Sequence, residues 1–170
     1  MKGITHIQHF VSDPDALFIY LKENVLWDEG MTARKTASFG VAYNYSQMSY
    51  PYQPFTPELQ ELVAGIGATI GFTPNNCLIN FYPDGTSKMG YHADQTDILE
   101  DGTGIVIVSI GATRILRFKR IADAGELVDF PLNSGSLIYM TQEVQQEWLH
   151  AIPAANTTDG RMSLTFRAIK

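Results

Sequence analysis

A histidine and a carboxylate one residue apart, His92 and Asp94, are the residues of this sequence whose spacing most directly suggests chemistry. They end a segment rich in strand-forming residues, and residues two apart in a strand share a face, so both side chains point the same way. An imidazole beside a carboxylate supplies two of the three ligands of the 2-His-1-carboxylate triad, which leaves open positions on non-heme Fe(II). The pattern is short, so its weight depends on what accompanies it.

Two arginines near the C-terminus could bind an anion. Arg161 and Arg167 fall in an expected strand over 161–169, where both face one side with Ser163 and Thr165 between them. Buried cations need partners, so this face would be costly in a plain hydrophobic core. Guanidinium groups bind carboxylates through two parallel hydrogen bonds, and a small dianion would satisfy both arginines.

The stretch that positions the His-x-Asp pair runs from 75 to 94. Residues 77–82 are apolar and aromatic, as strand formers are, and Pro83-Asp84-Gly85 has the composition of a turn before a second strand. Alternation along the first strand places Asn80 and Tyr82 on one face. The sequence therefore predicts two neighbouring strands that carry polar side chains toward a common site.

The remaining chain predicts two helices and a series of short strands. One helix begins at Pro14, with Ser12 or Asp13 as its N-cap, and the other begins at Pro57. Apolar residues follow each start at helical spacing, as far as Leu26 in the first helix. The expected strands are 4–11, 77–82, 88–93, 104–110, 114–120, 126–130, 135–140, 147–152 and 161–169.

This order of elements predicts an α+β fold in which the two N-terminal helices pack on one sheet of a double-stranded β-helix, or jelly roll. We expect a single domain over 1–170. Helices and a substrate lid would occupy about 1–75, and the jelly-roll core would occupy about 76–170.

Residues 31–56 are dominated by aromatic residues, Ser, Pro and Gly, so a hairpin with loops is expected there. The segment is either a cover that packs its rings on the core or a substrate lid whose rings stack on a flat ligand. Arg34 and Lys35 could contact a phosphate or form a solvated pair. The candidate substrate-contacting residues, in the lid and beside the metal site, are Arg34, Lys35, Phe39, Tyr43, Tyr45, Tyr91 and Trp148.

Composition excludes several classes of protein. No apolar run approaches the roughly 20 residues of a membrane helix, so no membrane association is expected. The single cysteine, Cys77, allows no internal disulfide and falls within an apolar strand. With one cysteine and no apolar signal segment at the N-terminus, we expect a cytoplasmic protein. We also expect a monomer. The net charge of −6 disfavours non-specific binding to duplex nucleic acid.

Together these pieces resemble the AlkB-like branch of the Fe(II)/2-oxoglutarate dioxygenases. The segment ARKTASFGVAYNYS at 33–46 is similar to the family's less uniform substrate-recognition region. The other matching motifs come in the family order and cover about the last hundred residues: LINFYPDG at 78–85, MGYHAD at 89–94, IVSIG at 107–111, GSLIYM at 135–140, QEWLHAI at 146–152 and RMSLTFR at 161–167.

The resemblance implies a set of roles and a reaction. The Fe(II) ligands that it implies are His92, Asp94 and His150. The 2-oxoglutarate contacts that it implies are Arg161 and Tyr82 at the distal carboxylate, Arg167 and Asn80 near the metal-chelating end, and Ser163. The family uses O₂ to convert 2-oxoglutarate to succinate and CO₂ while it oxidises a substrate C–H bond. Where that carbon is an N-methyl group, the product releases formaldehyde.

The sequence departs from the family pattern beside the metal pair. Many relatives that repair nucleobases carry an acid two or three places after the metal-binding aspartate. Here Gln95 and Thr96 are neutral, so the second place lacks the acid, and the first acid is Asp97, three places after Asp94. A basic cluster could contact a phosphate backbone or form a solvated hairpin, and strand alternation places at most half of it on one surface. Its members are Arg114, Arg117, Lys119 and Arg120.

Three functions remain open from the sequence. The first is demethylation of N-alkylated bases in nucleic acid, single-stranded or with the base flipped out. The second is hydroxylation or demethylation of a small-molecule metabolite, which the acidic charge and the neutral Gln95 and Thr96 favour. The third is a non-catalytic jelly-roll binding module.

Overall fold

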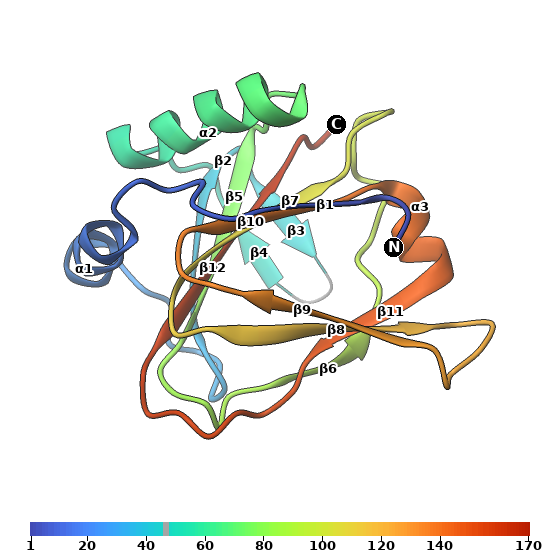
Figure 1. Ribbon diagram of the computed structural model, residues 1–170. Coiled ribbons are helices and arrows are strands. Elements are labelled where there is room, and N and C mark those ends of the chain that lie inside the picture. The colour runs from blue at the N-terminus through green and yellow to red at the C-terminus, as the bar shows by residue number, and fades with distance from the viewer. Residues whose placement is uncertain (46–47) are drawn as a thin grey trace.

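Two antiparallel sheets that face each other dominate the computed structural model, which describes residues 1–45 and 48–170 (Figure 1). The larger sheet has six strands, and each strand is antiparallel to its neighbours. Its strands, in spatial order, are β1 (Ile4–Ile7), β10 (Ser136–Met140), β7 (Ile105–Gly111), β12 (Arg161–Arg167), β5 (Asn76–Tyr82) and β2 (Lys35–Gly40).

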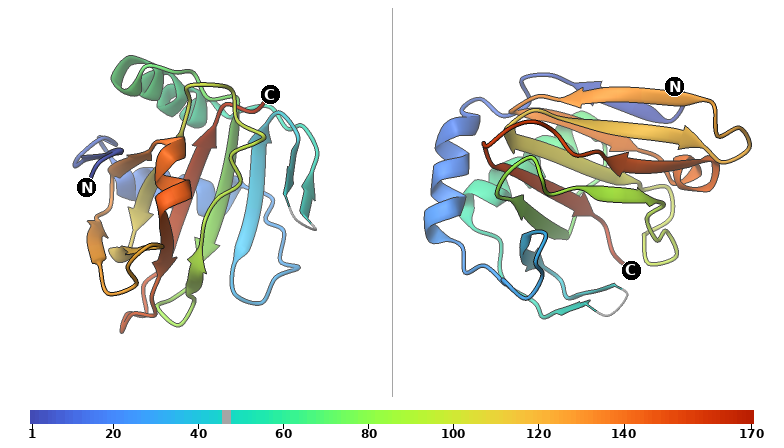
Figure 2. Two further views of the ribbon diagram at one scale, coloured as in Figure 1. Left: turned by 90° about the vertical axis from the view of Figure 1, so that its right-hand side faces the viewer. Right: turned by 90° about the horizontal axis from the view of Figure 1, so that it is seen from below.

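The smaller sheet has four antiparallel strands, and a separate two-stranded hairpin lies beside β2 (Figure 2). The strands of the smaller sheet, in order, are β6 (Met89–His92), β11 (Trp148–Ile152), β8 (Arg114–Arg120) and β9 (Leu127–Leu132). The hairpin consists of β3 (Tyr43–Tyr45) and β4 (Met48–Tyr50). From β5 to β12 the chain passes back and forth between the two main sheets and leaves four strands in each, as in a double-sheet jelly roll.

Two helices lie on the outer face of the larger sheet. They are α1 (Pro14–Asn24), whose N-cap Asp13 accepts a hydrogen bond from the Ala16 N–H, and α2 (Pro57–Ile70), which Thr56 caps. Leu21 of α1 and Ile66 of α2 are fully buried in one cluster with the outward side chains of β5, β7 and β12. This apolar layer leaves the opposite face of the larger sheet free to carry polar side chains.

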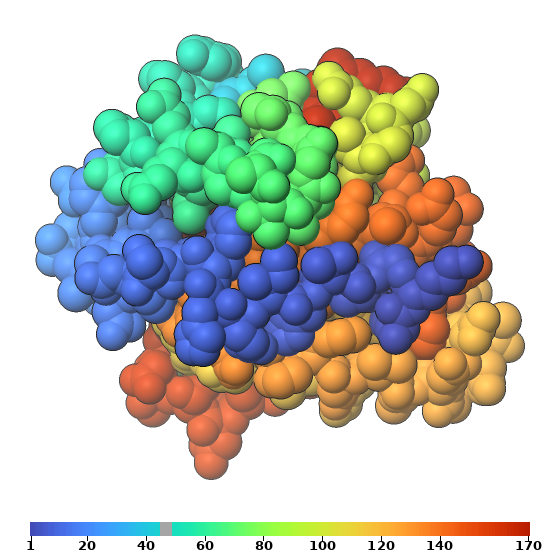
Figure 3. Space-filling view, turned by 45° about the horizontal axis from the view of Figure 1, so that its top comes forward, coloured from blue at the N-terminus to red at the C-terminus, as the bar shows by residue number. Residues whose placement is uncertain are grey.

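A second apolar cluster fills the space between the two sheets. It joins Ile107 and Ile138 of the larger sheet to Leu116 and Phe118 of the smaller one. The N-terminal segment lies along this sandwich in Figure 3, where it separates α2 from the β9 region. The edge of the His6 ring contacts Phe130 of β9 at a centroid distance of 5.6 Å.

Strand alternation decides which side chains reach the interior between the sheets. On β5, Cys77, Ile79 and Phe81 belong to the apolar layer under the helices, whereas Asn80 and Tyr82 line a cavity between the sheets. The expected grouping of Asn80 with Tyr82 is therefore confirmed, because side chains two apart in a strand share a face.

Several element boundaries differ from those expected. The first helix ends at Asn24, and Leu26 beyond it is 92% exposed. The first strand ends at Ile7 rather than residue 11. A short helix, α3 (Gln142–Glu147), precedes β11 and was not expected. Within the described residues, no helix is long and apolar enough to cross a membrane.

Candidate metal centre

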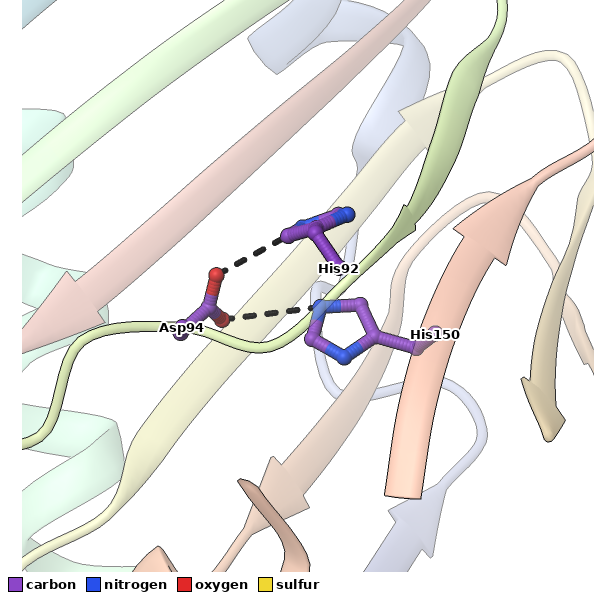
Figure 4. Close-up of side chains that lie close together, drawn as sticks. All are labelled: His92, Asp94 and His150. Atoms are coloured by element: carbon purple, nitrogen blue, oxygen red, sulfur yellow. Dashed lines mark ion pairs between the residues drawn. The ribbon is translucent and has the colours of Figure 1, made fainter. Parts of the chain in front are cut away.

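His92, Asp94 and His150 converge between the sheets (Figure 4). Their nearest ligand atoms all lie within 4.8 Å of one another. The Asp94 carboxylate faces both rings, with Oδ1 3.5 Å from His92 Nε2 and Oδ2 3.6 Å from His150 Nε2. Two imidazoles and a carboxylate that face one point are the donor set of the 2-His-1-carboxylate triad.

The backbone of the smaller sheet brings the two histidines together. His92 in β6 and His150 in β11 are direct cross-strand partners, and their ring centroids are 4.3 Å apart. The ladder becomes irregular between His150 and Ile152, where β6 and β11 change register. Asp94 lies two residues past the end of β6, and its N–H donates to the Gln145 side chain at 2.8 Å.

Hydrogen bonding selects the tautomer of His92. Its Nδ1 lies 2.8 Å from the carbonyl oxygen of Gly90, which can only accept, so Nδ1 carries the proton. In the neutral ring the Nε2 lone pair is then free, and Nε2 is the atom that faces Asp94. This arrangement, with the second ring nitrogen bonded to a carbonyl, is common for histidines that bind metal.

The protonation states at neutral pH suit a cation. Burial lowers the pKa of His150 to about 4, so this ring is neutral. Burial would raise the pKa of Asp94, but its hydrogen bond with His92 and the charges of Arg167 and of His150, which is protonated in the acid range where Asp94 titrates, outweigh that and lower it to about 2. Burial also acts to lower the pKa of His92, but the bonds to Asp94 and Gly90 prevail and the net shift is upward. A metal at this point would compete with a proton on His92.

The three residues lie at the wall of a cavity of about 520 Å³. The smaller sheet contributes the metal-binding candidates and apolar residues to its lining. The larger sheet contributes Leu78, Asn80, Tyr82, Ile107, Arg161, Ser163, Thr165 and Arg167. Residues ahead of the second helix complete the mouth with Met31, Arg34 and Tyr43.

Arg161 is fully enclosed in the wall of this cavity. The side chain is 2% exposed, and burial lowers its pKa to about 10. Its Nη2 donates to Ser109 Oγ at 2.9 Å, its guanidinium lies 5.7 Å from the Tyr82 ring centre, and its buried Nε has no hydrogen-bond partner among the described residues. A buried cation with an unsatisfied donor in the wall of a cavity fits an anionic ligand.

Arg167 lies closer to the metal-binding candidates. Its charge contributes to the low pKa of Asp94, and its guanidinium lies 5.0 Å from the Tyr43 ring centre. Its buried Nη1 also has no hydrogen-bond partner within the described parts of the chain. The donor chemistry therefore fits a ligand with a carboxylate at each end, one end at Arg161 and the other near Arg167 and the metal-binding candidates.

The residues predicted to contact a substrate do not all lie at the cavity. Arg34, Tyr43 and Tyr91 line it, and Arg34 Nε donates to Asn80 Oδ1 at 2.8 Å. The side chain of Tyr45 lies outside the described residues. Lys35, Phe39 and Trp148 do not line the cavity.

None of those three residues lines the cavity, for identifiable reasons. In β2, Lys35 and Phe39 pair with Phe81 and Cys77 of β5, which face the helices, and cross-strand partners share a face. Phe39 is therefore a core residue at 2% exposure, and Lys35 pairs with Glu29 at 3.1 Å. Trp148 packs edge-on against Phe118 in the apolar cluster between the sheets.

The basic cluster of β8 does not form a free cationic surface. Arg117 makes a bidentate pair with Asp129, and Arg120 pairs with Glu126. Arg114 is buried, and its Nη2 donates to the carbonyl oxygens of Ser87 and Pro153. Lys119 lies over the Tyr91 ring, 4.0 Å from its centre.

Two residues of the site, Ser109 and Gln145, were not predicted from the sequence. Ser109 shares the inward face of β7 with Ile107, and alternation would have found it once the direction of β7 was known. Gln145 lies in the unexpected helix α3, next to the exposed Gln146, and no sequence signal separates the two.

Comparison with known proteins gives consistent matches. The family model of the 2OG-Fe(II) oxygenase superfamily matches residues 20–167. The human DNA oxidative demethylase ALKBH2 is 30% identical over 181 aligned positions, which cover 93% of this chain and 69% of the relative. The alpha-ketoglutarate-dependent dioxygenase alkB homolog 3 of Rattus norvegicus is 28% identical over 94% of this chain and 61% of its own length. The chain thus spans about two thirds of these curated relatives.

The fold itself also has a match. The solved structure of OsALKBH1 superposes with a TM-score of 0.70 at 18% sequence identity, and the match covers 98% of this chain and 96% of the other. At that identity the likeness concerns the fold.

Proposed function

The chain belongs to the AlkB-like 2OG-Fe(II) oxygenases, and from that membership we propose that it oxidatively demethylates N-alkylated nucleic-acid bases with Fe(II), 2-oxoglutarate and O₂. The observation that carries the proposal is the convergence of His92, Asp94 and His150 beside two buried arginines with unsatisfied donors. The nucleic-acid substrate rests on the activity named for the human relative, DNA oxidative demethylase.

In this proposal the residues on and beside the smaller sheet bind Fe(II), and residues of the larger sheet bind 2-oxoglutarate. His92 Nε2, His150 Nε2 and the Asp94 carboxylate hold Fe(II), and all three present lone pairs at neutral pH once His92 is deprotonated. Arg161 binds the distal carboxylate of 2-oxoglutarate. Its guanidinium is oriented by the hydrogen bond from Nη2 to Ser109 Oγ and lies beside the Tyr82 ring. Arg167 and Asn80 lie toward the end of 2-oxoglutarate that chelates the metal, and Ser163 adds a polar contact.

When bound, iron and 2-oxoglutarate supply the oxidation: 2-oxoglutarate and O₂ yield succinate and CO₂, and one oxygen atom enters a substrate C–H bond. On an N-methyl group the product is an N-hydroxymethyl amine, which releases formaldehyde and the free amine. The protein's share is to hold that carbon beside the metal and to exclude water from the site. The rings of Tyr43 and Tyr91 at the cavity wall are available to orient a flat substrate.

A direct assay tests the proposal. Succinate and formaldehyde would be measured with Fe(II), 2-oxoglutarate and the purified protein, across N-methylated single-stranded DNA, RNA and pools of methylated metabolites. We expect equimolar succinate and formaldehyde with a nucleic-acid substrate, and no activity from His150→Ala. Absence of Fe(II)-dependent succinate with every substrate, including uncoupled turnover, would instead support a non-catalytic binding module.

A second candidate function is oxidation of a small-molecule metabolite. Two features favour it: in the part of the chain that the structure describes, the cavity lining offers no carboxylate for reading a base apart from the metal-binding one, and the basic cluster of β8 offers few unpaired cations for a phosphate backbone. Asp94 is the only carboxylate among the described residues that line the cavity, and it belongs to the metal-binding set. Arg117 and Arg120 are already paired with acids, and the net charge is −6. Binding to single-stranded DNA or RNA that weakens steeply with salt would favour the nucleic-acid substrate, and salt-independent turnover of a metabolite would favour this alternative.

A further inference from the structure

Asp94 is held differently from the two histidines that it faces. His92 and His150 are paired in the β6–β11 ladder, so the backbone of the sheet fixes both rings. Asp94 follows the end of β6, in a segment without regular structure (Figure 4). Its carboxylate nevertheless faces both rings, with oxygen atoms 3.5 and 3.6 Å from their Nε2 atoms. Something other than the sheet must therefore fix its backbone.

The side chain of Gln145 supplies that anchor. Its Oε1 accepts a hydrogen bond from the Asp94 N–H at 2.8 Å, and its Nε2 lies 3.7 Å from Met140 Sδ. Gln145 is only 5% exposed, and a buried amide is costly unless it is hydrogen-bonded. Its orientation is therefore fixed from both ends.

Helix α3 carries a second contact of the same kind. Gln142 lies three residues before Gln145, on the same helix face, and its Nε2 donates to the carbonyl oxygens of Glu100 and Thr103. The helix thus holds the segment from Asp94 to Thr103 at two points. It leads directly into β11, so one short stretch of chain anchors Asp94 and presents His150.

From this geometry we infer that Gln145 is a positioning residue for the metal centre, which aims the Asp94 carboxylate by holding its backbone N–H. The inference rests on the proposed function, because it assumes that His92, Asp94 and His150 bind a metal. Gln145 itself touches none of the metal-binding atoms. Loss of a residue that supports a ligand in this way typically weakens metal binding about 10- to 100-fold.

The first test measures metal affinity in the absence of turnover. Full-length apoprotein would be titrated with Mn(II) alone, and free Mn(II) would be followed by electron paramagnetic resonance. We expect Gln145→Met, which keeps the length and volume of the side chain but removes its oxygen acceptor, to raise the dissociation constant about 10- to 100-fold. The matched control is Gln146→Met, an exposed neighbour on the same helix, which should bind Mn(II) like the wild type.

The second test observes the hydrogen bond itself. Amide exchange at Asp94, measured by nuclear magnetic resonance on the metal-free protein, should be slow in the wild type because the N–H is bonded to a buried side chain. It should be at least about tenfold faster in Gln145→Met and unchanged in Gln146→Met, as expected when a protecting bond opens locally. A role confined to helix packing would leave the exchange at Asp94 unaltered.

The outcomes distinguish the positioning role from the proposed function. Failure of the wild type to bind Mn(II) would overturn the proposed function. Wild-type affinity and wild-type exchange in Gln145→Met would overturn the positioning role alone. If Gln145→Met does not fold, Gln145→Asn takes its place: it keeps the amide but is one methylene too short to reach Asp94, and the same two shifts are expected.

Discussion

Arg161 and Arg167 are the residues at which co-substrate binding and core structure are most easily confused. Both are buried on the inward face of β12, and each has a guanidinium nitrogen without a hydrogen-bond partner among the described residues. Their polar and ring contacts with Ser109, Tyr82 and Tyr43 are to neutral side chains. For Arg161, a role confined to folding would call for a buried carboxylate beside it, because an unpaired buried cation is costly; the carboxylate near Arg167 is that of the metal-binding candidate Asp94.

Arg161→Ala should raise the half-saturating 2-oxoglutarate concentration at least about tenfold while Mn(II) or Fe(II) still binds. Truncating one partner of a buried charge pair costs about 2–5 kcal/mol, which corresponds to about 30-fold or more in affinity. Arg161→Lys should recover only part of the loss, since an ammonium group cannot form the planar fork. Steady-state succinate formation against 2-oxoglutarate concentration measures both.

Arg120→Ala is the control for this experiment, since Arg120 is partly exposed and pairs with Glu126 outside the cavity. It should leave the 2-oxoglutarate dependence unchanged. An Arg161→Ala protein that melts at a lower temperature but keeps the wild-type 2-oxoglutarate dependence would show that the arginine serves folding alone.

Cys77 should be chemically silent in the native protein. It is fully buried under the helices, and burial raises the pKa of its thiol, an effect that nearby Arg167 only partly opposes. Since the thiolate is the reactive form, iodoacetamide at pH 8 should not label the folded chain and should label it rapidly in denaturant. Mass spectrometry of intact protein measures this, and rapid native labelling would mean that the β5 region opens.

Strand periodicity predicts the part of the candidate site that lies on β5 and β12. Asn80, Tyr82 and the inward residues of β12 share one cavity because a period of two is set by backbone geometry. The metal-binding candidates were grouped by the family resemblance, and Asp94 lies beyond the end of β6, where alternation does not apply. Phe39 and Trp148 do not line the cavity, which periodicity could not predict. Whether an aromatic residue meets the cavity or the core depends on register with a distant strand, as with Phe39 opposite Cys77, and sequence alone does not reveal it.

At the scale of elements, the segment expected to be a lid is divided between two structures. β2 is an edge strand of the larger sheet, with six residues in register with β5. The β3–β4 hairpin lies apart from that sheet and contacts it through Tyr50, whose hydroxyl is 2.6 Å from Thr36 Oγ1. The aromatic composition identified a segment near the site, but it could not reveal that β2 would pair with β5, because that contact is far apart in sequence.

We therefore expect hydrogen exchange to separate the two parts. The amides of β2 that pair with β5 should be protected with or without substrate, because they belong to a sheet that is continuous with the core. The β3–β4 hairpin and the residues around Arg34 should gain protection when substrate binds, since Tyr43 and Arg34 line the cavity mouth. Exchange mass spectrometry with a turnover substrate measures both regions.

Equal exchange in the hairpin before and after substrate binding would contradict a lid there. A substrate-dependent change in β2 would instead restore the broader lid, over residues 34–55, that the sequence suggested.

The unexpected helix α3 illustrates the same limit of local prediction. At six residues it is too short to show helical periodicity, and its polar face is turned toward Asp94 and Thr103 by tertiary contacts.

At the scale of the whole molecule, the two halves of the site lie on different sheets. The histidines belong to β6 and β11 of the smaller sheet, whereas Asn80, Arg161 and Arg167 belong to β5 and β12 of the larger one. The cavity between them interrupts the apolar cluster that otherwise joins the sheets. A ligand that chelates the metal at one end and pairs with Arg161 at the other would span this gap.

Metal and 2-oxoglutarate should therefore stabilise the fold cooperatively. A ligand that binds only the native state at about 100 times its dissociation constant adds about 2.7 kcal/mol, which raises the melting temperature by about 5–10 °C in a chain of this size. Under anaerobic conditions, Mn(II) with 2-oxoglutarate should raise the melting temperature by more than the sum of the two separate shifts.

Two controls accompany this measurement. 2-Oxovalerate, which lacks the distal carboxylate, should reproduce little of this synergy, and the His150→Ala variant should show no synergy. Strictly additive shifts in differential scanning fluorimetry would mean that the two ligands do not meet across the cavity, and the assignment of Arg161 and the histidines to one site would fall.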